Sequence, residues 1–177
     1  DLPGDVPLRV ACDVRSPLRD AARLFAPQKG ATPKQALALE RRLMDDTEFA
    51  PFADLAGAGA AGGLGAALAA LGGELVDGAQ LVLDLIGFDA RARRADLVVT
   101  GEGTVDATTF AGKAPGAVVE RCERLGVPCV LFGGRVRGTP ATGRVVALSG
   151  DPARARADLV ELGVRLGGGP RLDGRLA

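Results

Sequence analysis

The sequence contains no histidine, tryptophan or tyrosine among its 177 residues. Without histidine, the chain cannot form a Ser-His-Asp triad, a histidine-ligated zinc site or a histidine acid–base pair. Any catalysis must use carboxylates, lysine, arginine, hydroxyl groups and backbone amides. Aromatic residues make up 3% of the chain and hydrophobic residues 47%, so alanine, valine and leucine must build most of the core. Such small side chains permit close packing of helices on a sheet.

No excess of charge and no long apolar run is present either. The chain has 22 basic and 22 acidic residues, which argues against a nucleic-acid-binding protein. Its three cysteines form no Cys-x-x-Cys pair, so the sequence predicts neither a disulfide framework nor a zinc site and is typical of a reducing compartment. The longest apolar run, residues 66–71, is far shorter than the roughly 20 residues that span a bilayer. We therefore expect a cytoplasmic protein that binds neither nucleic acid nor membranes.

The chain begins at Asp1 rather than at methionine, and its first seven residues are typical of a connector. We therefore expect a fragment or a processed chain.

The pattern along the chain alternates short apolar strands with amphipathic helices. The predicted strands are 8–13, 96–100, 128–132 and 144–148. The predicted helices are 33–49, the second half of 56–73, 78–85, 89–94, 115–125 and a last one from 151 or 152 to 166. The alternation indicates an α/β fold of βαβ units with a parallel sheet. Because ligands bind beyond the carboxyl ends of such strands, we expect the loops after Asp13, Thr100 and Phe132 to meet at one edge.

A glycine-rich segment, residues 57–63, precedes the helix in the second half of 56–73. Its first six residues match the dinucleotide pattern Gly-x-Gly-x-x-Gly, but residues 51–55 before it form a poor strand. Three interpretations stay open: a dinucleotide site, a hinge or tight helix–sheet contact, and a backbone that binds an anion at the start of a helix. In the third interpretation, the phosphate of a nucleotide lies against Gly57, Gly59, Gly62 and Gly63.

A second polar loop follows the predicted strand 96–100. It ends in Gly112-Lys113 like a P-loop, but Ala107 and Ala114 replace the first glycine and the hydroxyl residue of that motif. Two carboxylates, Glu102 and Asp106, together with a lysine near a helix start suit Mg²⁺ and phosphate. A solvent-exposed acidic turn with no function is the open alternative.

Lysine occurs only at positions 29, 34 and 113, which suggests that a compact ammonium group matters in the strings PQKG and AGKAP. Lys34 has the features of an ordinary surface residue, and the same interpretation stays open for Lys29. Phosphoryl transfer needs an anion cradle, a cation, metal-binding carboxylates and a group that orients the attacking hydroxyl. The candidate catalytic residues are Asp13, Asp106 and Lys29. The candidate nucleotide-binding residues are Gly57, Gly59, Gly62, Gly63, Gly101, Gly103 and Lys113. The candidate metal ligands are Glu102 and Asp106.

Five strings in consistent order resemble the carboxyl-terminal half of the bacterial glycerate kinases. They are ACDV (11–14), FAPQKGATP (25–33), GAGAAGGLGAAL (57–68), DLVVTGEGTVD (96–106) and GKAPGAV (112–118). The resemblance implies ATP-dependent, Mg²⁺-dependent phosphorylation of D-glycerate. It also implies two α/β lobes, one flavodoxin-like and one similar to restriction endonucleases, with the amino-terminal half of the family fold missing. Residues 16–25 resemble a shortened form of a glycine-containing family loop.

We divide the chain on this basis into residues 1–74, a portion of the first lobe that ends in the glycine-rich hinge, and 75–177, a portion of the second lobe. Two further functional hypotheses stay open beside a kinase fragment or shortened member. One is a non-catalytic remnant that acts as a ligand-binding or interaction module. The other is a dinucleotide-binding oxidoreductase.

Overall fold

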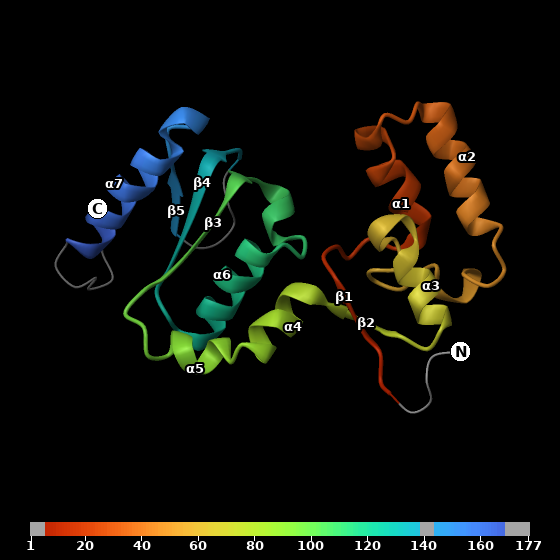
Figure 1. Ribbon diagram of the computed structural model, residues 1–177, viewed down its shortest axis with the longest axis horizontal. Helices are drawn as coiled ribbons and strands as arrows, with labels where there is room; N and C mark the ends of the chain where they lie inside the picture. Colours follow the sequence, from red (N-terminus) through yellow and green to blue (C-terminus); the bar gives the residue numbers. More distant parts are fainter. Residues whose placement is uncertain (1–5, 139–143, 169–177) are drawn as a thin grey trace.

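The computed structural model describes residues 6–138 and 144–168, which form strands alternating with helices (Figure 1). The strands are β1 (Arg9–Cys12), β2 (Glu74–Asp77), β3 (Val98–Val105), β4 (Cys129–Val136) and β5 (Arg144–Ala147). The helices are α1 (Leu18–Phe25), α2 (Pro33–Met44), α3 (Leu64–Ala70), α4 (Gly78–Leu85), α5 (Phe88–Ala92), α6 (Ala114–Leu125) and α7 (Ala155–Gly167). Two short 3-10 turns matter below: η1 (Pro27–Lys29) and η4 (Ala107–Phe110).

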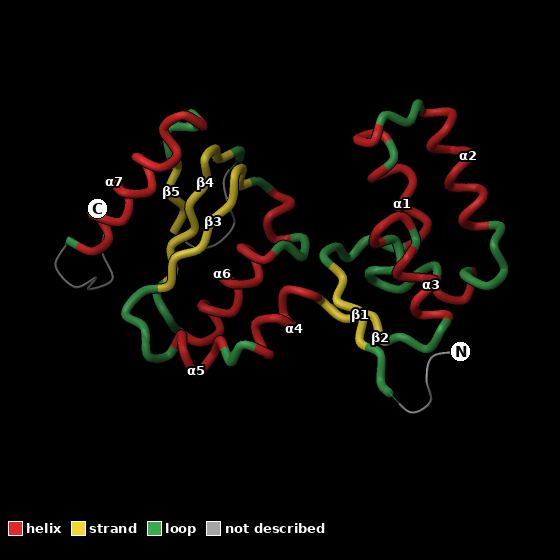
Figure 2. Tube along the Cα trace, in the orientation of Figure 1, coloured by secondary structure: helices red, strands yellow, loops and turns green. Residues whose placement is uncertain are grey.

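The strands pair in parallel in two separate sheets (Figure 2). One sheet contains β1 and β2, and the other has the order β3-β4-β5. Parallel pairing confirms the predicted α/β fold class. The expectation that the loops after Asp13, Thr100 and Phe132 share one edge is wrong, because β1 lies in a different sheet from β3 and β4.

Around the β1–β2 sheet, α1, α2 and α3 form a helical cluster with a small core. The buried residues of that core are Leu18, Ala53, Ala58 and Ala66, and Leu43, Met44, Phe49, Phe52 and Leu75 pack against it. The segment 16–25, which we expected to be a shortened loop, contains α1 instead. Its apolar residues Leu18, Ala21, Ala22 and Phe25 have helical spacing, and the first three are buried.

The predicted N-terminus of α2 is confirmed by a capping box. The N–H of Gln35 donates to the Thr32 hydroxyl at 3.3 Å, and the N–H of Thr32 donates to the Gln35 side chain at 2.8 Å. The helix ends at Met44 rather than at Phe49. Phe49 belongs to a turn and packs against the core of the helical cluster, so tertiary contact ends the helix early.

The second sheet extends further than the sequence pattern indicates. β3 pairs with β4 from Val98 as far as Val105, so Gly101, Glu102 and Gly103 are strand residues rather than loop residues. The core beneath this sheet contains Val105, Val119 of α6 and Leu131, all at most 1% exposed. Because β3 continues past Thr100, the side chain of Glu102 has a fixed position on a strand.

A buried arginine joins the helices that cover the second sheet. The Arg121 side chain of α6 is 10% exposed and donates hydrogen bonds to Gln80, Asp84 and Asp89 from α4 and α5. Beside it on α6, Cys122 is fully buried. Burial, with a smaller contribution from Cys122, raises the pKa of Cys129 to about 12.

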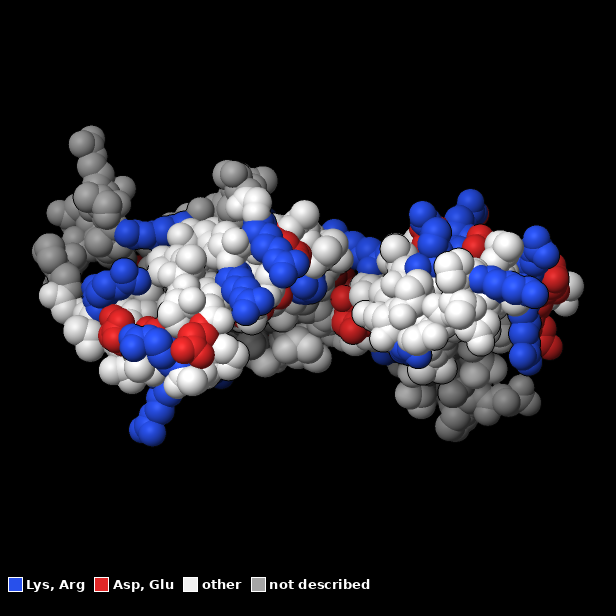
Figure 3. All heavy atoms as spheres, turned by 90° about the horizontal axis from the view of Figure 1, so that it is seen from above, with Lys and Arg blue, Asp and Glu red and all other residues white. Residues whose placement is uncertain are grey.

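Acidic and basic side chains are interspersed on the surface seen in Figure 3. Within the described ranges, every helix is too short or too polar to cross a lipid bilayer.

Candidate functional site

A cavity of about 490 Å³ lies where the end of β1 meets the starts of α4 and α6. Asp13 and Lys113 supply its two charged side chains, from segments that lie 100 positions apart in the sequence. The remaining lining residues are small or apolar: Ala11, Gly78, Ala79, Val82, Leu83, Gly112, Ala114 and Val118. A Cβ on Gly112 would lie 3.8 Å from the backbone oxygen of Asp13, so the two chain segments are in close approach. The structure thus brings Asp13 and Lys113 to one site.

Lys113 is held by a chain of polar contacts that begins on β3. Its ammonium lies 3.4 Å from Glu102 Oε2, and the Thr109 hydroxyl donates to Glu102 Oε1 at 2.5 Å. Thr109 is fully buried, and its hydroxyl also accepts the N–H of Asp106 at 3.0 Å. Gly116 of α6 permits this arrangement, because a Cβ there would lie 2.2 Å from the backbone oxygen of Thr109. Glu102 therefore has both oxygens engaged and fixes Lys113 at the start of α6.

Asp106 begins the η4 turn and is tied down locally. Its Oδ1 accepts the Thr108 hydroxyl at 2.6 Å and the Thr108 N–H at 2.8 Å. These hydrogen bonds, that from the side chain first, hold the pKa of Asp106 below its ordinary value. The carboxylate therefore stays ionised, as a metal ligand or hydrogen-bond acceptor requires.

An ion pair braces the loop that carries Asp13. Arg15 donates to Oδ2 of Asp77 at 2.6 and 3.1 Å, and Oδ1 of Asp77 accepts the N–H of Gln80 at the start of α4 at 3.1 Å. Burial raises the pKa of Asp77, but the hydrogen bonds from Arg15 and Gln80 outweigh it and leave the pKa below its ordinary value. This ion pair links the loop after β1 to the end of β2.

The carboxylates suit only one kind of magnesium site. Within residues 6–138 and 144–168, no three acidic or cysteine side chains are grouped to form a closed metal cage. Glu102 is fully engaged, whereas Asp106 uses one oxygen for its hydrogen bonds to Thr108. Mg²⁺ commonly takes one or two protein carboxylates and completes its octahedron with water and phosphate oxygens. A single carboxylate with one oxygen outside these hydrogen bonds, as in Asp106, is compatible with that mode.

The glycines of segment 57–63 are not among the residues that line the cavity of Asp13 and Lys113, and their surroundings differ from one another. A Cβ on Gly57 would lie 2.7 Å from the sulfur of Cys12, and one on Gly59 would lie 2.6 Å from the backbone oxygen of Pro17. Gly63 faces Leu18 and Leu43. These three glycines pack against the protein itself. Gly62 has a φ of +76° and open space where a Cβ would be. Of these four glycines, Gly62 is therefore the one whose backbone is open to a ligand.

The two glycines of β3 also differ from one another. A Cβ on Gly101 would lie 2.5 Å from the ring of its neighbour Phe132, whereas Gly103 faces open space beside Gly134 and Arg135. Gly103 lines a cavity on the β4–α7 side and is not among the residues around Asp13 and Lys113.

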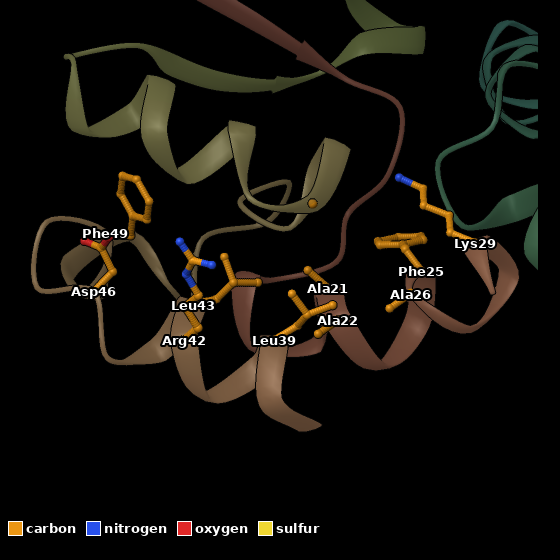
Figure 4. Close-up of a pocket in the computed structure, with 11 residues that line it drawn as sticks. Ala21, Ala22, Phe25, Ala26, Lys29, Leu39, Arg42, Leu43, Asp46 and Phe49 are labelled. Carbon is orange, nitrogen blue, oxygen red and sulfur yellow. The ribbon is translucent and has the colours of Figure 1, made fainter. Parts of the chain in front are cut away.

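Lys29 lies in a second cavity, between α1 and α2, where it is joined by Gly62 (Figure 4). Of the charged residues predicted for the site, Asp13, Glu102, Asp106 and Lys113 therefore belong to one group, and Lys29 lies in a different cavity.

Sequence reasoning missed Thr109 and Arg15. Thr109 stands three positions after Asp106, the spacing of a capping box, which is a signal that could have identified it. No local pattern marks Arg15, because its partner Asp77 is 62 positions away.

Comparison with known proteins gives the family. The model of the glycerate kinase family matches residues 2–148. The chain belongs to the glycerate kinase family. It is 40% identical over 141 residues to a glycerate kinase of Bacillus cereus, covering 74% of this chain and 37% of that protein. It is 38% identical over 140 residues to glycerate 2-kinase of Escherichia coli, covering 73% of this chain and 37% of the relative.

Among solved structures, the chain resembles a protein assigned as glycerate kinase 2 of Salmonella typhimurium LT2. The TM-score is 0.59 at 32% sequence identity, over 92% of this chain and 49% of the other. The chain thus spans a little over a third of the length of these two glycerate kinases and about half of the solved one.

Proposed function

We propose that this chain is part of a kinase that transfers the γ-phosphoryl group of ATP to a hydroxyl group of D-glycerate. The observation that carries the proposal is the cavity in which Asp13 and Lys113 meet, one side chain able to accept a proton and the other able to bind an anion. Family membership supplies the substrate class. The motifs that flank both residues lie inside the matched region.

The residues of the cavity divide the chemical work between them. Asp13 accepts a hydrogen bond from the attacking hydroxyl of glycerate and takes up its proton. The new oxygen–phosphorus bond forms as the bond from the γ-phosphorus to the bridging oxygen breaks, and ADP leaves. Lys113 neutralises the charge on the transferred phosphoryl group. Glu102, fixed by Thr109, keeps the ammonium of Lys113 directed to one place. The small residues Gly78, Gly112 and Ala114 leave room for a three-carbon acid.

Asp106 would hold Mg²⁺, which when bound neutralises phosphate charge and orients the phosphate oxygens. Its hydrogen bonds to Thr108 keep it ionised and fix its direction. We also propose that the division near residues 74 and 75 separates a flavodoxin-like lobe from one similar to restriction endonucleases. Under this proposal, the remainder of the family fold completes both lobes.

A coupled assay of ADP release with D-glycerate tests the proposal. Because the chain covers little more than a third of its curated relatives, we expect only trace turnover from these 177 residues. Joining them to the part of a relative that they do not match should restore the roughly 1–100 s⁻¹ typical of kinases. Robust turnover by these residues alone would contradict the expectation that the unmatched part of the relatives is needed to complete the site.

Paired variants in the joined enzyme test the residues. Asp13→Asn and Lys113→Met should each lower kcat by about 10²-fold, the scale of one catalytic group. Lys34→Met, the same change on the exposed start of α2, should leave kcat unchanged. Full activity in Asp13→Asn would show that Asp13 is not the proton acceptor. Ligand binding without turnover in the joined enzyme would favour the non-catalytic ligand-binding module.

A further inference from the structure

The cavity between α1 and α2 has the lining of a small-molecule site. Its volume is about 420 Å³, within the roughly 300–1,000 Å³ usual for ligand pockets. Most of its walls are apolar side chains of the two helices and the turn after α2, and Figure 4 shows them around one space: Ala21, Ala22, Phe25, Ala26, Leu39, Leu43 and Phe49. A neighbouring groove of about 600 Å³ along α2 shares Ala26, Lys29, Leu39 and Arg42 with it.

Two features of this cavity favour a bound ligand. Gly62 contributes only backbone to the lining, and its positive φ opposes replacement by any residue with a Cβ. Leu39 lines both the cavity and the groove, and it remains 43% exposed. A ligand that covers this large apolar side chain removes apolar surface from water, which favours binding.

The charges at the cavity call for an anionic ligand. Lys29 and Arg42 both line it, and in the described part of the chain neither forms an ion pair with a carboxylate. The one acidic lining residue, Asp46, accepts the N–H of Glu48 at 3.0 Å. The lining therefore carries two cations against one anion. Figure 4 shows Lys29 at the Phe25 end and Asp46 at the Phe49 end.

We propose that this cavity binds the purine base of a nucleotide and that Lys29 binds its phosphates. The flat ring of a base would lie between the apolar faces of α1 and α2, where Phe25 and Leu39 can cover it. At the Asp46 end, a carboxylate accepts hydrogen bonds, which suits the amino group of adenine. This inference rests on the proposed function and gives the nucleotide a position in it.

The position of Lys29 is compatible with phosphoryl transfer to a substrate beside Asp13 and Lys113. Lys29 ends η1, and Figure 1 shows the segment after α1 on the side of the helical cluster that is turned toward η4 and α6. Phosphates held by Lys29 would thus extend toward the part of the molecule that contains Lys113. An uncharged apolar ligand would leave Lys29 and Arg42 without partners, so the charges favour the nucleotide over it.

Calorimetric titration of the chain with three probes distinguishes binding of the base at one end of the cavity from binding of the phosphates at the other. The probes are ATP, adenosine, which lacks phosphates, and inorganic tripolyphosphate, which lacks the base. Leu39→Gln should raise the Kd for ATP and adenosine about tenfold, equivalent to 1.4 kcal/mol, and leave that for tripolyphosphate unchanged. Leu37→Gln is the matched control, since Leu37 is 47% exposed on the same helix and lines neither space.

Lys29→Met should produce the opposite pattern. The Kd for ATP and tripolyphosphate should rise about tenfold, while that for adenosine stays the same. Lys34→Met, at an exposed lysine five residues after Lys29, should change none of the three Kd values. Circular dichroism on every variant shows that the fold is retained.

Each outcome decides the proposal. Absence of ATP binding to the folded chain, or ATP affinity that Leu39→Gln and Lys29→Met leave unchanged, overturns it. Glycerate-dependent turnover in the joined enzyme with ATP affinity insensitive to both variants would keep the proposed function and reject this position for the nucleotide. ATP binding that follows the predicted pattern without glycerate-dependent turnover would keep the cavity and reject the function.

Discussion

The β1–β2 sheet and the β3–β4–β5 sheet are both parallel, yet different contacts hold their surroundings together. Around β1 and β2, alanines and glycines bring backbones into contact, as where Gly65 of α3 approaches the oxygen of Gly57. Around β3 and β4, valines and leucines form the core, and polar groups such as Arg121 and Thr109 join the helices to it. Backbone contacts therefore hold the surroundings of the first sheet, whereas side-chain hydrogen bonds hold charged groups in place around the second.

The largest effect should come from breaking the backbone contact of the first sheet. A Cβ on Gly65 would lie 2.2 Å from the oxygen of Gly57, so Gly65→Ala should lower the free energy of unfolding by about 3 kcal/mol. Gly163→Ala is the matched control, because Gly163 lies in α7 with open space around its Cβ position. It should stabilise the chain by roughly 0.5–1 kcal/mol through helix propensity. Urea denaturation measures both, and equal midpoints would contradict the role given to the contact.

The second largest effect should come from Asp106, the carboxylate that follows β3 of the second sheet. Asp106→Asn in the joined enzyme should lower kcat by about 10²-fold, because an amide is a poorer ligand than a carboxylate for the proposed Mg²⁺. The fold should survive, since Asn also caps a turn well. Unchanged kcat with a normal melting temperature would make Asp106 an ordinary turn residue.

A smaller loss is expected where helices α4, α5 and α6 meet. Arg121→Met removes a buried cation whose partners Asp84 and Asp89 are 61% and 45% exposed. Because water partly replaces the arginine at those partners, we expect a loss of about 1–2 kcal/mol rather than the full cost of a buried pair. Arg124→Met, an exposed change one residue before the end of α6, should alter the melting temperature little. Similar losses in the two variants would argue against the Arg121 contacts.

The smallest effect should appear as a pH dependence of stability near the first sheet. The folded-state pKa of Asp77 is lowered, so its ion pair with Arg15 stabilises the protein fully above the unfolded value of roughly 3.9. That contribution, about 1 kcal/mol because Arg15 is largely exposed, should be lost as pH falls through the lower folded value.

Unfolding of wild type and Asp77→Asn at a series of acid pH values checks this. The difference between them should shrink below about pH 4. Glu74→Gln on the same strand is the control, because the Arg9–Glu74 pair is exposed at both ends and should contribute little. A difference that does not change with pH would contradict the assignment.

Local signals allowed the sequence to predict several elements. Thr32 and Pro33 marked the start of α2, and α6 ends at Leu125, as predicted. The limits of β3 and the existence of β2 depended on partners far along the chain, because β2 is a strand only through its pairing with β1, 65 positions away. The helix α1 had a readable apolar spacing, which the family resemblance obscured.

For the candidate site, residue types were easier to predict than their neighbours. Glu102 and Lys113 were expected to act together, and the structure shows them as an ion pair. That Lys29 would lie in a different cavity from Lys113 could not be predicted, since the strings carry no information on which sheet each strand joins. The roles of the glycines stay predictions, though three of the four in segment 57–63 now have packing contacts.

The burial of Cys122 has a kinetic consequence. This thiol on α6 is fully buried, and burial raises its pKa, which leaves almost no reactive thiolate at neutral pH. A reagent that alkylates thiols can reach Cys122 only when the helix moves away from the sheet. The rate at which Cys122 is modified therefore measures how often this part of the molecule opens, with no added label.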